Sequence, residues 1–420
     1  DPSGPLPEPS AAPLRLVVEA SLLSAFAFLP LGFYQPFFPL WLSGQQFDAS
    51  TIGLLMALPT VLRVLSAPTL SGLADRHVPP RFLLMTFSAL SSFGWLILDR
   101  LPHGIGVIVC VCLSTTLMLA VLPLSEVALL DAVRKQTALR YGRLRVWGSI
   151  SFILANIGGG VWVATLSGAS VPKVLAVLCA LTACLGFFMR SGMDLPGRLA
   201  ATQRSAVKPL PQRLYVLLLG LAAINASHAV LNGFGPVLWT QQGFNASEIG
   251  WLTAASVFVE VYVFIKIGGA SSPKQAFRFM LVGAVAGMAR WALMTEVTGF
   301  FWVAGLQMLH ALNYGLFHLG ALAMVSTLAP VERRGRAQGL MSASNGLFYA
   351  LVMLGAGPLV QHFGAGAYWA MVPCILCGLV LITLACRSNG SESACVPQRV
   401  KAGLRPASNS IKWRAAVQAE

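Results

Sequence analysis

The sequence predicts an all-α membrane protein whose twelve transmembrane helices form two six-helix bundles. Of its 420 residues, 56% are hydrophobic and only 10% are charged, a balance far outside that of soluble domains. A bilayer core about 30 Å thick requires a helix of roughly 20 apolar residues. The chain contains twelve such runs, and the longest polar interruption follows the sixth. The chain therefore divides into two halves of six spans each.

The twelve runs define the predicted domains. They fall near residues 16–42, 51–71, 82–98, 104–124, 146–167, 171–190, 214–240, 248–268, 276–295, 299–324, 337–360 and 366–386. Gly and Pro inside some runs are compatible with this prediction, because neighbouring helices satisfy the freed backbone groups. The expected units are a disordered N-terminal tail (1–13), a first bundle (14–190), a cytoplasmic linker (191–213), a second bundle (214–386) and a basic cytoplasmic tail (387–420).

The positions of the basic residues predict the orientation. When the first and last few residues of a run are counted with the adjoining connection, all but four of the 29 Lys and Arg residues lie in the termini or in connections that follow even-numbered runs. The exceptions are Arg100 and Lys173 in the opposite connections, and Arg63 and Arg290 inside runs. The positive-inside rule then puts both termini in the cytoplasm. The net charge of +14 is thus explained by topology, with membrane lipid rather than nucleic acid as the partner.

Motifs for enzymatic or metal chemistry are absent from the sequence. Six of the eight cysteines lie within apolar runs without clustered His or acidic partners, so no metal site is predicted. There is no Ser/His/Asp set, no HExxH zinc motif and no phosphate-cradling glycine loop. We therefore expect neither an enzyme nor a cofactor.

The turn after the second run contains the sequence Ser-Gly-Leu-Ala-Asp-Arg-His-Val-Pro-Pro-Arg over residues 71–81. This turn, together with the division into six and six spans, resembles the Major Facilitator Superfamily, in which one half rocks against the other. The resemblance implies that Asp75, Arg76 and Arg81 hold a closed cytoplasmic gate through charged hydrogen bonds. The alternative is a solvated turn that only obeys the positive-inside rule. Val78 stands where that motif has a second glycine.

Further motifs resemble the 3-phenylpropionate permease family, a branch of this superfamily related to the lactose permease group. They are Pro-Leu-Ser-Glu-Val-Ala-Leu-Leu-Asp (123–131), Tyr-Gly-Arg-Leu-Arg-Val-Trp-Gly-Ser (141–149), His228 with Gly233 and Phe234, Val-Glu-Val (259–261), Ala-Arg-Trp (289–291) and the stretch 307–322. The resemblance implies a proton-coupled importer of a small organic acid in a bacterial inner membrane.

Three ionisable residues lie deep inside runs of the second half. Glu260, Arg290 and His310 lie about twelve, fourteen and eleven residues into their runs, which puts each near mid-depth at about 1.5 Å per residue. A charge at the bilayer centre costs at least about 2.5 kcal/mol on insertion scales, so each needs a partner or a watery cavity. We predict a proton relay in which Glu260 carries the proton, since burial disfavours its charged form and a nearby Arg290 favours it. The alternative is a structural ion pair packed beside His310.

The tenth run contains a polar stripe. At about 100° per residue, four side chains fall on the same side of the helix as His310, namely Asn313, Tyr314, Phe317 and His318. His318 lies roughly 12 Å farther toward the cytoplasm, where it would be a second relay or a substrate contact. We assign Asn313, Tyr314 and His318 to the cavity wall, with His228 and Asn232 of the seventh run.

In the first half, Glu126 and Asp131 point about 140° apart on a regular helix, and the family motif favours Glu126 for the cavity. Arg143 and Arg145 point about 200° apart, so only one is a good partner for Glu126. We select Arg145 and leave Arg143 open. An anionic substrate needs a cationic contact, which Arg145, Arg63 or Arg290 could supply through bidentate carboxylate binding.

Aromatic residues suggest a planar substrate. Five lie close together in the first run and three are spread over the second half. They are Phe33, Tyr34, Phe37, Phe38 and Trp41, and Trp239, Trp251 and Trp291. Such rings can line a cavity, although Trp and Tyr also collect at membrane interfaces. Where the family often has tyrosines after the histidine of the seventh run, this chain has Leu231 and Asn232.

The function predicted from the sequence is alternating-access symport of a proton with a small, aromatic carboxylate by a monomeric protein. One alternative keeps the fold and the proton but moves a sugar or a nucleoside. A second alternative, from another class, is a membrane scaffold or sensor that transports nothing and uses its buried charges for packing.

Overall fold

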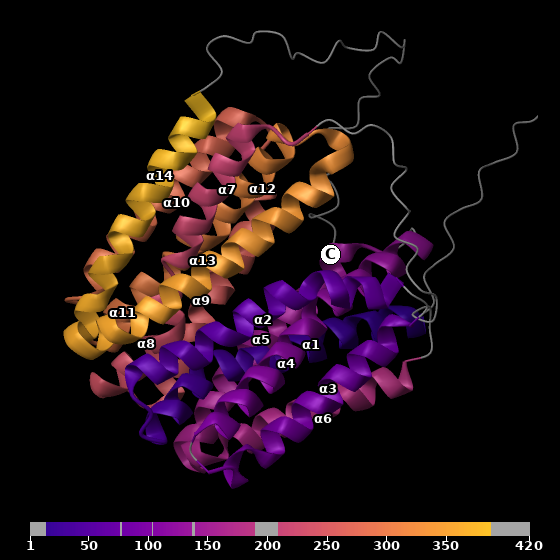
Figure 1. Cartoon of the computed structure of the whole chain (residues 1–420), viewed down its shortest axis with the longest axis vertical. Helices are drawn as coiled ribbons and strands as arrows, with labels where there is room; N and C mark the ends of the chain where they lie inside the picture. Colours follow the sequence, from indigo (N-terminus) through magenta and orange to yellow (C-terminus); the bar gives the residue numbers. More distant parts are fainter. Residues whose placement is uncertain (1–13, 76–77, 103, 137–138, 190–208, 388–420) are drawn as a thin grey trace, which may run out of the picture.

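The computed structural model describes residues 14–75, 78–102, 104–136, 139–189 and 209–387, which form helices and no strand. The predicted N-terminal tail, most of the predicted linker, the predicted C-terminal tail after residue 387, and Arg76 lie outside the described residues. Within the described part of the chain, the helices form two bundles that lean together at one end (Figure 1).

The first bundle contains six helices, each long enough to account for one predicted run. Connections are short, as is usual between neighbouring helices of a bundle. The helices are α1 (Leu14–Gly44), α2 (Ala49–Asp75), α3 (Pro80–Ile97), α4 (Ile105–Lys135), α5 (Tyr141–Thr165) and α6 (Val171–Phe188). Pro30, Pro36 and Pro39 lie inside α1 without ending it.

The second bundle contains eight α-helical segments because two of its crossings are interrupted. The segments are α7 (Gln212–Ala226), α8 (Ala229–Gln241), α9 (Ala246–Ile267), α10 (Pro273–Met294), α11 (Phe300–Met308), α12 (Phe317–Leu328), α13 (Arg334–Phe363) and α14 (Met371–Arg387). The crossing α7–α8 breaks beside His228, and a π-helical turn, η3 (Ala311–Leu316), joins α11 to α12 beside His310. Neither interruption was predicted.

Eleven described helical segments are long and apolar enough to span a membrane. The last of them, Val331–Arg387, has 57 residues. It contains both α13 and α14, joined by the 3-10 segment η5 (Gly364–Ala370), and these two helices run in opposite directions (Figure 1). The segment therefore contributes two crossings, and the described residues make twelve crossings, the predicted number.

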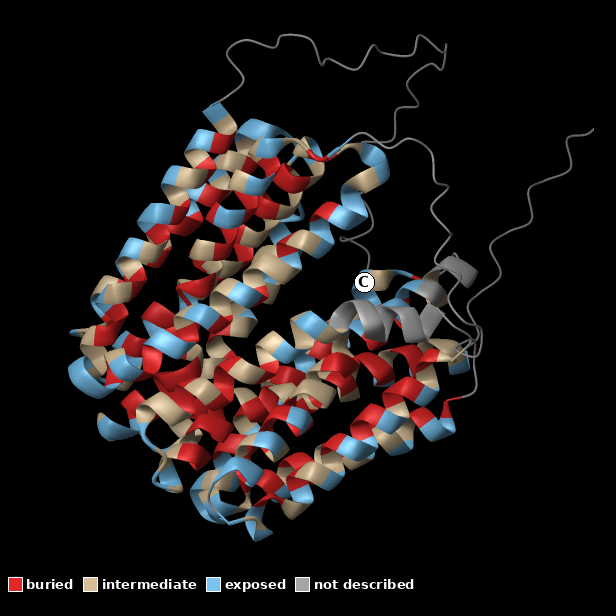
Figure 2. Ribbon diagram, in the orientation of Figure 1, coloured by how far each residue is buried: buried red, intermediate tan, exposed pale blue. Residues whose placement is uncertain are grey.

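The outer surface is suited to lipid. Exposed residues cover the outward faces of the helices and buried residues fill the interior of both bundles (Figure 2). Many of the exposed side chains are large and apolar, among them Phe93, Leu154, Phe258 and Leu351. In water such a surface would mark an aggregation-prone or interacting protein, whereas a bilayer solvates it.

Glycines bring the two bundles into backbone contact at the end where they lean together. A Cβ at Gly160 of α5 would lie 2.7 Å from the carbonyl oxygen of Ala246, and Gly250 of α9 lies against Asn156. A second contact joins α2 to α13, where a Cβ at Gly53 would lie 2.9 Å from the carbonyl oxygen of Met353. Small residues allow this close helix approach in membranes.

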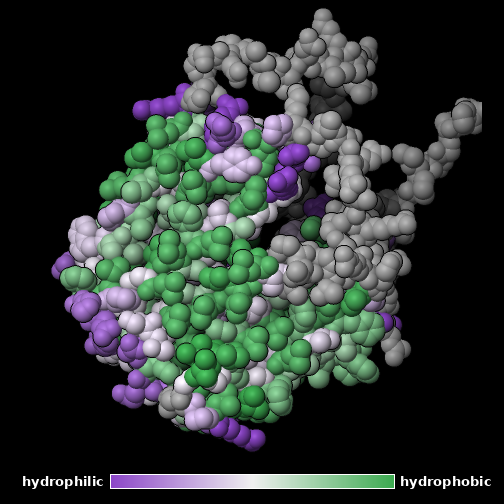
Figure 3. All heavy atoms as spheres, in the orientation of Figure 1, coloured by the Kyte–Doolittle hydropathy of each residue, from purple (hydrophilic) through white to green (hydrophobic). Residues whose placement is uncertain are grey.

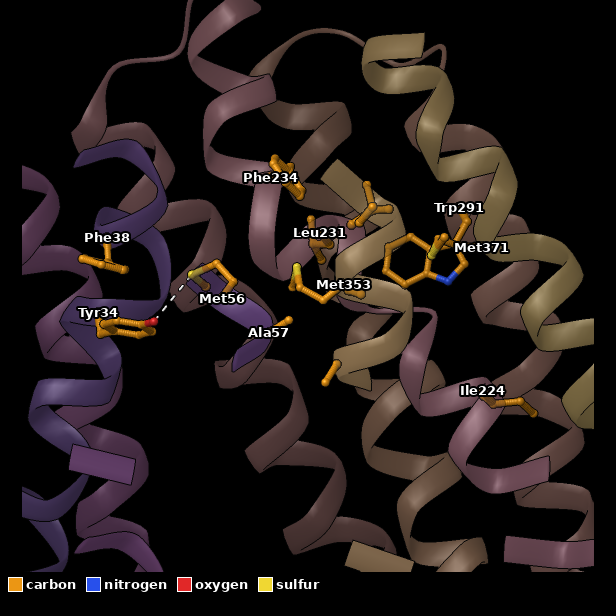
Figure 4. Packing of buried hydrophobic residues seen from close by; sticks show 14 of the residues in the cluster. Tyr34, Phe38, Met56, Ala57, Ile224, Leu231, Phe234, Trp291, Met353 and Met371 are labelled. Carbon is orange, nitrogen blue, oxygen red and sulfur yellow. Dashed lines mark hydrogen bonds between the residues drawn. The ribbon is translucent and has the colours of Figure 1, made fainter. Parts of the chain in front are cut away.

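Apolar packing continues across the same junction. Met56 and Ala57 of α2 face Met353 of α13, with Leu231 and Phe234 of α8 nearby (Figure 4). At the opposite end the bundles diverge, and a recess opens between them (Figure 3). The conformation is therefore closed at one end and open at the end where α1 begins and α14 finishes (Figure 1).

Gly250→Leu is expected to open the closed end. Overpacking costs about 1–3 kcal/mol, which is about a 5- to 150-fold change in a two-state equilibrium. A cysteine introduced at Gln35, which lines the space between the bundles, should then react faster with a membrane-impermeant maleimide applied from the closed side of a background lacking native cysteines.

Gly158→Leu is the matched control, because a Cβ at Gly158 of α5 meets no atom within 4 Å. Equal labelling rates in both variants would contradict the assigned role of the glycine contact.

Candidate functional site

A cavity of about 290 Å³ lies between the two bundles. Its wall combines residues of α1 and α5 with residues of α7, α8, α9 and the interrupted crossing α11–α12. Polar side chains that line it include Gln35, Arg145, Asn225, His228, Asn232, Glu260, Gln307 and His310. The cavity is large enough for a small organic molecule and brings polar groups of both halves together.

Glu260 and His310 meet at the cavity wall, as predicted from their depth. Oε2 of Glu260 on α9 lies 3.3 Å from Nε2 of His310, which precedes the π-helical turn. Both side chains are about one-seventh exposed, at 14% and 16%. The carboxylate approaches the turn closely because Gly315 has no side chain there: a Cβ would lie 3.2 Å from Cγ of Glu260.

Arg290 lies behind His310 and has no exposed surface. Its Nη1 lies 3.2 Å from Nδ1 of His310 and donates to Oδ1 of Asn313 at 3.2 Å, while Nη2 donates to Oε1 of Gln307. The guanidinium also lies 4.9 Å from the ring centre of Trp291. Because a buried charge is tolerated only when hydrogen-bonded, these partners are what permit a cation here.

The partners of His310 determine its tautomer. A guanidinium can only donate, so Nδ1 of His310 accepts from Arg290. Nε2 then carries the hydrogen that faces Glu260. His310 thus contacts both a permanent cation and an acid at the cavity wall.

His228 joins the same network through Asn313. Nδ2 of Asn313 donates to Nε2 of His228 at 3.1 Å, and Nδ1 of His228 donates to the carbonyl oxygen of Asn225, also at 3.1 Å. Since Nε2 accepts and Nδ1 donates, His228 is satisfied as a neutral imidazole. At the break between α7 and α8, the carbonyl of Asn225 accepts from both the backbone N–H and the ring of His228.

Arg145 and Glu126 form an ion pair in the first bundle. Nε of Arg145 on α5 lies 3.6 Å from Oε1 of Glu126 on α4, and the guanidinium packs 3.8 Å from the ring centre of Phe28. Arg145 lines the cavity, whereas Arg143 is exposed. The geometry thus favours Arg145 over Arg143; Asp131's side chain lies outside the described part.

One polar contact joins the halves directly across the cavity. Nε2 of Gln35 on α1 donates to Oδ1 of Asn232 on α8 at 3.5 Å. Both residues line the cavity. Asn232, selected from the sequence as a substrate contact, is therefore placed where it can exchange a partner in the other half for a ligand.

The predicted stripe on the tenth run is divided between two places. The rings of His310, Tyr314 and His318 form a stacked column, with centroid distances of 5.0 and 6.1 Å. Tyr314 lines the large cavity, but Asn313 and His318 line a separate cavity of about 20 Å³ behind it. The π-helical turn changes the angular spacing that the prediction assumed, so these two side chains are not part of the main wall.

The aromatic wall contains residues that were selected from the sequence and residues that were not. Phe28, Phe152, Trp239 and Tyr314 line the cavity, and of these Trp239 and Tyr314 were selected. The aromatic cluster of the first helix is instead buried inside the first bundle, where Phe38 packs 5.1 Å from Trp95. Planar apolar surface is therefore present at the cavity, and Phe28 and Phe152, which were not selected, supply part of it.

Two other cations considered from the sequence do not line the cavity. Arg290 is shielded from it by His310 and Gln307. Arg63 lies on α2 beside Gly346 of α13. Arg145 is thus the one of the three candidate arginines that faces the cavity.

The predicted gate is only partly described. The side chain of Asp75 and the whole of Arg76 lie outside the described residues. The guanidinium of Arg81 lies 4.7 Å from the ring centre of Phe82. The gate therefore stays a prediction.

Three residues of the site were not selected from the sequence. Gln307 precedes His310 by one helical turn and Asn225 precedes His228 by three residues, a spacing that places side chains on one helix face. That spacing could have identified them. Gln35 has no such signal, because its role depends on contact with the other half. Among the described residues, no group of three or more His, Cys, Asp or Glu could hold a metal ion.

The fold and the cavity are those of a membrane protein with two helical bundles around a central site. Residues 19–388 match the family model described as the MFS_1 like family. The chain belongs to this family of the Major Facilitator Superfamily, so it is a multi-pass membrane transporter and not an enzyme.

Two curated relatives cover most of the chain. A probable 3-phenylpropionic acid transporter of Escherichia coli (strain K12) is 28% identical over 351 residues, which are 82% of this chain and 91% of the relative. The maltose permease of Geobacillus stearothermophilus is 27% identical over 383 residues, which are 86% of this chain and 93% of the relative.

Solved structures confirm the predicted fold class. The nucleoside transporter NupG matches with a TM-score of 0.72 at 17% identity, covering 88% of this chain and 98% of NupG. A bacterial homolog of the human lysosomal transporter Spinster, solved inward-facing and occupied, matches with a TM-score of 0.65 at 14% identity, covering 88% of this chain and 94% of that one.

Arg290→Met is expected to destabilise the protein strongly. The substitution leaves the acceptor atoms of His310, Asn313 and Gln307 without their buried donor. Breaking a buried charge network costs about 3–5 kcal/mol. Thermal unfolding in detergent, compared with Arg145→Met, checks this prediction.

Arg145 is a suitable comparison because its side chain is 28% exposed and its ion pair is partly solvated. Exposed pairs contribute about 0–1 kcal/mol. A loss of stability as small for Arg290→Met as for Arg145→Met would contradict the structural role given to Arg290.

Proposed function

We propose that the protein is a proton-coupled symporter that imports a small aromatic carboxylate by alternating access. The observation that carries the proposal is the chain of contacts from Arg290 through His310 to Glu260, which ends at the wall of the cavity between the halves. Acidic residues inside membrane spans are rare, and one that faces a cavity and has a cationic group nearby typically marks a functional site.

The balance of charges around the cavity links proton to substrate. Glu126 with Arg145, and Glu260 with Arg290, supply two negative and two positive charges. When a proton neutralises Glu260, one positive charge is left in excess. A monocarboxylate compensates that excess, so the proton and the anion favour each other's binding, as linkage requires.

The transport cycle follows from this coupling. Glu260 takes up a proton when the cavity opens to the outside, the substrate binds between the bundles, and the bundles rock. On the inside, loss of the substrate anion leaves the excess positive charge uncompensated, which favours release of the proton. The Nε2–H of His310 faces the Glu260 carboxylate, and Arg290 holds the imidazole in this orientation through Nδ1.

The cavity wall supports an aromatic acid as the substrate. Arg145 offers a cation, and Phe28, Phe152 and Tyr314 offer apolar ring surface near it. Arg is well suited to bind a carboxylate through two parallel N–H groups. The likeness to a probable 3-phenylpropionic acid transporter points to the same substrate class.

A sugar is the second candidate substrate. Gln35, Asn225 and Asn232 line the cavity with amide groups that suit hydroxyl groups, and a maltose permease is among the relatives. Competition of uptake by aromatic acids and by sugars separates the two candidates.

The proposed location is a bacterial inner membrane, and the positive-inside distribution supports an orientation with both termini in the cytoplasm. In that orientation the closed end of the two bundles faces outside and the open end faces the cytoplasm. The conformation described above then corresponds to the state that releases substrate.

Glu260→Gln is expected to abolish uphill accumulation while exchange of substrate is retained. Glutamine keeps the size of the side chain but cannot carry the proton. Proteoliposomes with an imposed pH gradient should then equilibrate a labelled aromatic acid without concentrating it. Glu248→Gln is the control, because Glu248 caps the start of the same helix α9 and does not line the cavity. Normal accumulation by Glu260→Gln would exclude Glu260 as the proton carrier.

Arg145→Gln is expected to raise KM for the aromatic acid by about tenfold to a hundredfold. This change corresponds to the free energy that a hydrogen bond to a charged group contributes. The measurement is the concentration dependence of uptake. Arg143→Gln is the matched control, since Arg143 is exposed two residues away on α5. If Arg145→Gln keeps its affinity for the acid, the carboxylate binds elsewhere.

A further inference from the structure

A second cavity, of about 510 Å³, lies at one end of the second bundle. None of the residues that line it also lines the central cavity with Glu260 and His310. It is bounded by the start of α10, the end of α12 and the end of α14. The connections at this end follow even-numbered crossings, so it is the end predicted to face the cytoplasm. The cavity therefore lies where a membrane helix leaves the bilayer for the cytoplasm.

Three cations line this cavity, namely Lys274, Arg278 and Arg387. All three residues are exposed. Within the described part of the chain, none of them forms an ion pair. The site thus has an excess of positive charge. The first turn of α10, which starts at Pro273, adds the positive end of a helix dipole.

The rest of the wall is apolar. Phe277, Met324 and Leu328 contribute side chains from α10 and α12. Hydrophilic groups gather at this end of the second bundle and an apolar flank begins directly below them (Figure 3). A ligand that fits both parts must have an anionic head and a hydrocarbon body.

We propose that this cavity binds an anionic phospholipid of the cytoplasmic leaflet, with its phosphate among Lys274, Arg278 and Arg387 and an acyl chain along Phe277 and Met324. Basic pockets between membrane helices on the cytoplasmic side are suited to anionic headgroups. Charge complementarity selects an anionic lipid over a zwitterionic one, and the apolar wall selects a lipid over free phosphate.

The test measures the affinity of the full-length protein for phosphatidylglycerol in detergent by native mass spectrometry, with phosphatidylethanolamine as the comparison lipid. The double variant Lys274→Gln with Arg278→Gln should bind phosphatidylglycerol about 25-fold more weakly, since each basic residue near the surface contributes about fivefold. Both side chains are exposed, so folding should persist, and thermal unfolding without added lipid verifies this.

Arg336→Gln is the matched control, because Arg336 is exposed near the start of α13 at the same end and does not line the cavity. Unchanged phosphatidylglycerol affinity in the double variant overturns the proposal, as does an equal loss in the control. Equal affinity for glycerol phosphate overturns it too, because a soluble anion would then suffice.

A photoreactive benzoylphenylalanine in place of Phe277 tests the occupant directly in phosphatidylglycerol vesicles. A cross-link to lipid supports the proposal. A cross-link to a peptide from residues 388–420 overturns it, because the chain's own C-terminal segment would then fill the cavity.

Discussion

A guanidinium without exposed surface must be surrounded by acceptors, and much of the second bundle is arranged to supply them to Arg290. Gln307, His310 and Asn313 come from one crossing and contact it together. Because Arg290 occupies one ring nitrogen of His310, the other is directed to Glu260. Because it occupies the oxygen of Asn313, the amide nitrogen is directed to His228. One buried cation thus fixes the donor and acceptor roles of the whole network.

This constraint explains why the site is asymmetric between the halves. In the second bundle, Arg290, His310, Asn313 and His228 are largely buried and hydrogen-bonded to one another, so the loss of a partner is costly there. In the first bundle, the carboxylate of Glu126 is 44% exposed and its ion pair with Arg145 is partly solvated. A group that must change partners during a transport cycle is better placed in the partly solvated ion pair of the first bundle. The division suits a proton site on one side and an adaptable substrate contact on the other.

The sequence predicted the fold and the central contact because both depend on quantities that can be counted along one helix, namely its length in apolar residues and the depth of each residue. Hydrophobic runs identify crossings, and equal depth brought Glu260, Arg290 and His310 together. Cavity lining was predicted less well. The π-helical turn moved Asn313 and His318 away from the main wall, and the rings of the first helix turned into their own bundle. Such features depend on packing between helices and not on the periodicity of one helix.

The two interrupted crossings have a mechanical consequence. Both belong to the second bundle and both break beside a histidine of the network, whereas α1 and α5, which form the facing wall, are continuous. Short helical pieces joined by irregular turns can shift separately, but an unbroken helix transmits force along its length. A change of charge at the network can therefore be absorbed locally on one side while the opposite side acts as a stiff lever. Binding of a proton would then tilt one bundle against the other, with local rearrangement confined to the two interrupted crossings.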